Sequence, residues 1–441
     1  MPGFGFTPDN GDEDESRGNN PFGFENFGEI FKQFSGMGLN LPALMASLSG
    51  QASPASLSKE MIRDISRKYL SAHGEVPVTV EDLTQIQEAI NIADLWINEA
   101  TTFPALPLTD SIALSRRDWI DSTLNGWQEL TKPLVDSMSA ALSSMLDQGL
   151  GEQGEGSGIS IPGFGPMSIS KSSINAIMAT FMSSLISTQL GQSIGALSTT
   201  VTGANDVALP LSKDIKAQLL PQNVRAWGSG LEIQEAEIRI YLALREIAAA
   251  RLFKQSPWLS GYIGEVISAY GSGIRIDINA ITQSAQDAMD SGAIDPSNPE
   301  SMASALSGGL FTPETSASQS AALEKLETLL ALIEGWIDAV VVKAATDRLP
   351  SLIKLRESQA RRRATNSPTQ QLFATLLGLE VSPRLTREAI SFWEKLEKID
   401  SISARDKVWE EAFLLPNASQ LLDPEGFSNS RKIPDDLSGL I

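Results

Sequence analysis

The sequence contains no cysteine, and among its 441 residues it has a single histidine, His73. The lack of cysteine excludes disulfides, thiolate metal sites and a thiol nucleophile, and it is in keeping with a reducing, cytoplasmic location. His73 stands beside Gly74 in a predicted turn, where we expect it at the surface. No serine–histidine relay is visible, so nucleophilic catalysis of that type is not indicated.

The sequence also lacks targeting and membrane segments. Its N-terminus has neither a basic n-region nor an apolar h-region, so we expect no secretion signal. The most membrane-like stretch, residues 173–201, is interrupted too often by Ser, Thr, Gln and Asn to face lipid. We interpret it as a soluble core helix whose small residues, Gly191, Gly195 and Ala196, allow another helix to approach closely.

Positive charge is scarce, because 34 lysines and arginines face 54 aspartates and glutamates and the net charge is −20. Such a surface repels phosphate backbones and anionic lipid, so nucleic acid and membrane are not expected as partners. The one basic cluster, Arg361 to Arg363, is expected to pair with acidic residues nearby. A peptide or another protein remains as a possible partner.

Hydrophobic residues make up 42% of the chain, enough to build a core, and they recur at helical rather than strand spacing. Thr79, for example, precedes an amphipathic stretch as a plausible N-cap, with Glu81 and Asp82 in the first turn. The fold class is therefore mainly α. We predict a disordered Gly/Phe-rich acidic tail (1–55), an N-terminal helical part (56–147), a Gly-rich loop (148–166), a helical core (167–430) and a C-terminal tail (431–441).

A candidate site lies in the helix predicted around residues 241–259, which carries Arg245 and Glu246 on an otherwise apolar segment. Zincin-type hydrolases place H-E-x-x-H on a helix, where two histidines bind zinc and the glutamate acts as general base. Here Glu246 takes the glutamate position, but Arg245 and Ala249 occupy the ligand positions. A later helix carries E-G-W-I-D, with the carboxylates of Glu334 and Asp338 one turn apart, where zincins have a third ligand.

Several blocks resemble the actinobacterial zincin-like metallopeptidase family, often labelled zinc-dependent metalloproteases. They are IADLWINEAT (92–101), LGQSIGAL (190–197), LLPQNVRAWGSGL (219–231), IYLALREIAAARLFKQSPWL (240–259), GGLFTPE (308–314), LETLLALIEGWIDAV (326–340) and RRRAT (361–365). The resemblance implies a multi-helix zincin-like domain whose zinc site joins the two motif helices.

By the same resemblance, Glu246 matches the catalytic glutamate and Glu334 the later acidic ligand. Trp258 and Trp336 match structural aromatics of the two motifs. The sequence departs from the family at Arg245 and Ala249, and at Gln255, where some members have a histidine.

Without imidazole or thiolate, the only candidate ligands are Glu246, Glu334 and Asp338, and carboxylates alone hold zinc poorly. We therefore expect no metal cofactor, and expect Arg245 to bridge Glu334 or Asp338 in the space a metal would fill. The sequence favours a catalytically degenerate family member that acts as a binding or regulatory protein. The alternative is an active metal-dependent hydrolase that uses a carboxylate-rich site around Glu246 and Glu334.

Overall fold

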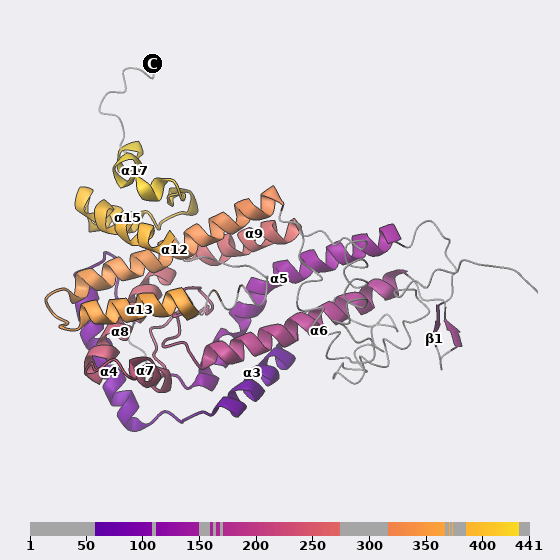
Figure 1. Ribbon diagram of the computed structural model, residues 1–441, viewed down its shortest axis with the longest axis horizontal. Coiled ribbons are helices and arrows are strands. Elements are labelled where there is room, and N and C mark those ends of the chain that lie inside the picture. The colour runs from indigo at the N-terminus through magenta and orange to yellow at the C-terminus, as the bar shows by residue number, and fades with distance from the viewer. Residues whose placement is uncertain are drawn as a thin grey trace, which may run out of the picture.

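The computed structural model describes residues 58–107, 112–149, 159–161, 165–167, 171–273, 316–366, 370, 373 and 385–431. Helices dominate this part of the chain (Figure 1), so the prediction of a mainly α protein is confirmed. The strands described are β1 (Ile159–Ile161) and β2 (Gly165–Met167), which pair antiparallel. They lie in or beside the stretch predicted as a Gly-rich loop. The predicted tail 1–55 lies outside the described residues, and so do residues 432–441 of the predicted C-terminal tail 431–441.

The α-helices are numbered as in Figure 1. In chain order they are α3 (Lys59–His73), α4 (Val80–Ile97), α5 (Arg116–Gly149), α6 (Lys171–Ser198), α7 (Pro221–Gly228), α8 (Glu235–Gln255), α9 (Leu259–Ser272), α12 (Ala317–Ala345), α13 (Leu352–Asn366), α15 (Thr386–Ile399), α16 (Ile402–Lys407) and α17 (Pro424–Ser430). Two 3₁₀ turns, η3 (Ala412–Leu414) and η4 (Gln420–Leu422), precede α17.

The start of α4 is fixed by a capping box. The Thr79 hydroxyl accepts a hydrogen bond from the Asp82 backbone N–H at 3.1 Å, and the Asp82 carboxylate accepts one from the Thr79 N–H at 2.9 Å. These bonds satisfy N–H groups that have no partner within the helix, and they confirm Thr79 as the N-cap. Beyond the cap, Ile86, Ile90 and Ala93 are buried where α4 packs on α8.

Glycines in α6 allow α3 to pack unusually close. A Cβ atom at Gly191 would lie 2.8 Å from the Ile65 Cβ, and one at Gly195 would lie 2.7 Å from the Tyr69 Cβ. The Ser66 hydroxyl also donates to the Gly191 carbonyl at 2.9 Å. The close approach predicted from the small residues is confirmed. No helix within the described ranges is apolar over enough length to cross a membrane.

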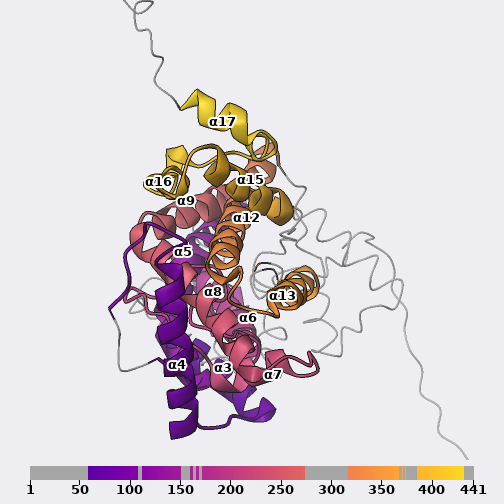
Figure 2. The same ribbon diagram turned by 90° about the vertical axis from the view of Figure 1, so that its left-hand side faces the viewer.

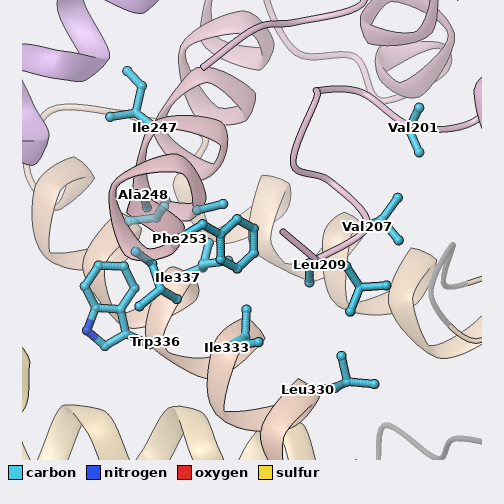
Figure 3. Close-up of a cluster of buried hydrophobic side chains, with 14 of the residues drawn as sticks. Val201, Val207, Leu209, Ile247, Ala248, Phe253, Leu330, Ile333, Trp336 and Ile337 are labelled. Atoms are coloured by element: carbon cyan, nitrogen blue, oxygen red, sulfur yellow. The ribbon is translucent and has the colours of Figure 1, made fainter. Parts of the chain in front are cut away.

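Helix α8 lies between α4 and α12 and packs against both (Figure 2). Every residue from Tyr241 to Phe253 is buried. Figure 3 shows the apolar contact with α12, where Ile333, Trp336 and Ile337 lie near Phe253. Any charged residue on this part of α8 must therefore find its partners inside the protein.

Candidate functional site

Arg245 of α8 and Glu334 of α12 form a buried ion pair, with side chains only 7% and 13% exposed. The Arg245 Nη2 donates to Glu334 Oε1, and its Nη1 lies 4.0 Å from Asp338 Oδ1. Burial alone would raise the pKa of Glu334, but Arg245 and then Arg363 outweigh it and hold that pKa below its usual value. The structure thus brings together Arg245 and the two acidic residues that the sequence placed beside it.

Helix α13 supplies three more arginines to the same region. Arg363 Nε lies 3.3 Å from the same Glu334 Oε1, and Arg356 Nη2 donates to Asp338 Oδ2 at 2.5 Å. Arg362 donates to the Thr200 carbonyl. Arg361 pairs with Glu357 at 3.2 Å on the surface, and Arg362 and Arg363 both pair with Asp206. The expectation that this basic cluster pairs with acidic residues is confirmed.

Asp206, in the loop before α7, completes the arrangement. Its carboxylate lies 2.8 Å from Arg363 Nη2 and 3.3 Å from Arg362 Nη1, and it accepts the Thr202 N–H at 2.8 Å. Burial raises its pKa, but the two guanidinium groups reverse the effect and lower it strongly. We call the alternating set the charge network: Arg356, Asp338, Arg245, Glu334, Arg363, Asp206 and Arg362.

Glu246 is not part of this network, although it follows Arg245 directly. Adjacent residues of an α-helix point about 100° apart, and the Glu246 carboxylate turns toward the loop before α7. It accepts hydrogen bonds from Asn205 Nδ2 at 2.7 Å, from the Asn205 N–H at 3.1 Å and from the Gln218 N–H at 3.2 Å. Gly203 makes room for it, because a Cβ there would lie 2.2 Å from Glu246 Oε2.

The partners of Glu246 are therefore neutral N–H groups, and the described residues offer it no ion pair of its own. Burial raises the pKa of Glu246 to about 8 from 4.5, against the opposing effect of these N–H groups, so the carboxyl group is mostly protonated at neutral pH.

This pKa gives a testable pH dependence. The folded protein keeps a proton that the unfolded chain releases, so the stability from Glu246 is complete below pH 4.5 and is lost as pH rises to about 8. At 1.36 kcal/mol per pKa unit, the loss is roughly 4–5 kcal/mol. Glu246→Gln should remove this pH dependence of the free energy of unfolding, which urea unfolding at pH 5, 7 and 9 would measure. The exposed control Glu88→Gln should follow wild type; equal slopes for Glu246→Gln and wild type would refute a protonated Glu246.

The remaining sequence candidates lie apart from the charge network. Ala249 is 3% exposed and contributes a methyl group to the core. Gln255 is exposed at the end of α8. His73 is exposed in the last turn of α3, as expected, and stacks on Tyr69 with the ring centroids 4.1 Å apart.

A surface pocket of about 300 Å³ lies between α4, α7 and the start of α8. Ile86, Val224 and Ile238 line it, with Arg225 and Arg239 among its polar groups. None of the residues singled out from the sequence as site candidates lines this pocket.

The model of the zincin-like metallopeptidase family matches residues 59–428, which is most of the chain. The chain belongs to this family. Among curated proteins, none matches the sequence. The fold is similar to that of a protein from Chloroflexus aurantiacus, whose crystal structure is described as a candidate hydrolase with a novel fold. That similarity has a TM-score of 0.55 at 16% identity and covers 86% of this chain and 100% of the other.

Zincin-like metallopeptidases imply a zinc ion, but the residues at the corresponding place do not fit one. A ligand needs a lone pair, whereas the Arg245 guanidinium offers only N–H donors and Ala249 offers no polar atom. One oxygen of Glu334, Oε1, already accepts hydrogen bonds from two arginines. Across the described ranges, no three His, Cys, Asp or Glu side chains come together in a way that could hold a metal ion.

Proposed function

We propose that this zincin-like metallopeptidase family member is non-catalytic, and that it acts in the cytoplasm as a binding or regulatory protein. The observation that carries the proposal is the buried pair between Arg245 and Glu334, the residues at the first ligand position and the later acidic position of the family's zinc site. The Arg245 guanidinium already neutralises the Glu334 carboxylate. It would repel a metal cation at the same place.

The packing of the two motif helices supports a replacement of metal by arginine. A guanidinium group can bridge two carboxylates in a fixed geometry, as a metal ion does. Arg245 approaches both Glu334 and Asp338 in this way. The helices can therefore keep their arrangement without zinc, which is what a family member needs when it retains the fold but not the chemistry.

The alternative is an active hydrolase with a carboxylate-rich metal site around Glu246 and Glu334. The raised pKa of Glu246 is a property that general bases share. However, Asn205 and Gln218 surround its carboxyl oxygens, and Glu334 is engaged by Arg245 and Arg363. Both acids would have to give up their partners before they could hold a metal or a water molecule, so we favour the non-catalytic function.

Elemental analysis of purified protein tests the proposal. Wild type should hold no stoichiometric zinc, whereas Arg245→His with Ala249→His restores H-E-x-x-H beside Glu334 and should gain about one zinc per chain. The single change Arg245→His leaves one imidazole short and should gain none. Adding Glu334→Gln to the double variant should abolish the gain. A tightly held zinc in wild type, lost together with peptidase activity in Glu246→Gln, would make the protein an enzyme.

A peptide or protein is the partner we propose, because the net charge of −20 disfavours phosphate-bearing surfaces. The pocket between α4, α7 and α8 is lined by Ile86, Val224 and Ile238 and by the ion pairs Arg225–Asp82 and Arg239–Glu235, so it suits a peptide that offers polar groups beside an apolar side chain. Binding of short DNA duplexes at low salt, measured by gel shift, would count against this choice of partner.

A further inference from the structure

The loop that joins α6 to α7, residues 199–220, is packed into the core, whereas most loops run over the surface. Val207 and Leu209 are 0% and 1% exposed, and they belong to the same buried cluster as Phe253 of α8 (Figure 3). The loop backbone is strained at Ala208, whose φ of 60° lies in the left-handed region that side chains disfavour. Because a strained segment persists only where its surroundings hold it, this loop depends on firm anchors.

The two ends of the loop lie beside each other. The Leu220 N–H donates to the Thr202 carbonyl at 2.9 Å. The Ala204 N–H donates to the Gln218 carbonyl, also at 2.9 Å. Both ends therefore pass the same place in the fold, and this place is where Glu246 leaves α8.

Glu246 is bonded to both ends of the loop, through Asn205 Nδ2 at 2.7 Å and the Gln218 N–H at 3.2 Å. The Gly203 backbone lies against the other carboxyl oxygen, so closely that a Cβ there would be 2.2 Å away. Any molecule that contacts this carboxyl group has to stand where the loop stands. Since a general base must reach the proton that it takes, the loop denies this position to water and substrate.

A second anchor holds the loop on α13. Asp206 follows Asn205 directly, and its carboxylate pairs with Arg363 and Arg362. Arg363 Nη2 also donates to the Asp206 backbone carbonyl at 2.8 Å. Two successive residues thus tie the loop to two helices, Asn205 to α8 and Asp206 to α13.

We propose that the α6–α7 loop is a built-in plug, in which residues 203–218 close the face of α8 that carries Glu246. The inference rests on the proposed function, because it takes Glu246 as the former catalytic position. The site is then closed twice, by the Arg245–Glu334 pair and by the loop. A peptide partner must therefore bind at another surface, and zinc restored through Arg245→His with Ala249→His would not by itself give a substrate access to Glu246.

Carboxyl labelling of the full-length protein tests the plug, with a carbodiimide and glycine ethyl ester as the probe and peptide mass spectrometry as the readout. In wild type, Glu246 should react far more slowly than Glu88, an exposed acid of α4. The double change Asn205→Ala with Asp206→Ala releases both anchors. It should raise the labelling rate of Glu246 by about tenfold or more, because local opening then costs less free energy.

Controls in the same experiment separate an open loop from an unfolded protein. Asp406 is 1% exposed and bonds to other segments, so its labelling rate should not change in the double variant. Lys213→Ala, at an exposed position of the same loop, should label as wild type. If the double variant does not fold, Asn205→Ala alone carries the test and should act in the same direction.

Three results would overturn the plug. They are a wild-type Glu246 as reactive as Glu88, a Glu246 that reacts no faster once the anchors are removed, and a joint rise of Glu246 and Asp406, which would mean that only global unfolding exposes Glu246.

The zinc measurement keeps the two proposals apart. A zinc-free wild type with a reactive Glu246 would refute the plug and leave the non-catalytic function standing. Zinc in a wild type whose Glu246 is unreactive would refute the non-catalytic function and leave the closed loop standing.

Discussion

Arg245→Ala is expected to lower the free energy of unfolding by roughly 3–5 kcal/mol, the usual cost of breaking a buried ion pair from one side. The reason is that Glu334 and Asp338 would stay buried with less positive charge beside them. Arg363 and Arg356 still contact these carboxylates, so the protein should fold but melt at a lower temperature. Urea unfolding with a linear extrapolation measures the loss.

The control for this change is Arg361→Ala. Arg361 belongs to α13 and pairs with Glu357, but its side chain is 72% exposed. Exposed pairs between residues one turn apart contribute only about 0.3–0.5 kcal/mol, so this variant should remain close to wild type. Comparable losses for Arg245→Ala and Arg361→Ala would show that Arg245 does not stabilise the site.

A double-mutant cycle separates the pair from its surroundings. Arg245→Met with Glu334→Gln removes both charges while keeping similar volumes, and its destabilisation should be clearly smaller than the sum of the two single changes. Additive losses would mean that the two groups do not interact in solution.

The sequence was sufficient to predict the family, the helical class and the contact between the two motif helices. The contact follows from residue types, because an arginine inside an apolar helix needs a carboxylate, and E-G-W-I-D offers two in the matching motif. The close approach of another helix to α6 was also predictable, since Gly191 and Gly195 are spaced one turn apart on one face; the structure shows that this helix is α3.

The parts that the sequence did not predict depend on contacts between distant segments. Asp206 was not among the site residues predicted from the sequence, yet it binds arginines from α13. Asn205 and Gln218 gave no signal as partners of Glu246, because both donate backbone N–H groups that any residue would offer; Asn205 adds its side-chain amide. The rotation of about 100° per residue along α8 turns Glu246 toward Asn205, whereas the neighbouring Arg245 points to the carboxylates of α12.

Another buried acid, Asp406 of α16, connects three parts of the fold, one of them the motif helix α12. It is 1% exposed and accepts hydrogen bonds from the Thr101 hydroxyl at 2.7 Å, the Thr102 N–H at 2.7 Å and the Trp336 indole N–H at 3.1 Å. It also pairs at 2.8 Å with Arg405, which is itself fully buried. One carboxylate thus fixes the tryptophan of the E-G-W motif and the chain after α4.

Asp406→Ala should therefore lower the free energy of unfolding by roughly 3–5 kcal/mol, because it leaves the Trp336, Thr101 and Thr102 donors unpaired in the core. Arg405 keeps Glu397 at 2.6 Å, so the arginine alone would not account for the loss. Asp406→Asn retains a side-chain acceptor and should lie between Ala and wild type. Asp423→Ala, which removes an exposed N-cap from α17, should cost only about 1 kcal/mol. Equal effects of Asp406→Ala and Asp423→Ala in urea unfolding would show that Asp406 does not hold these segments together.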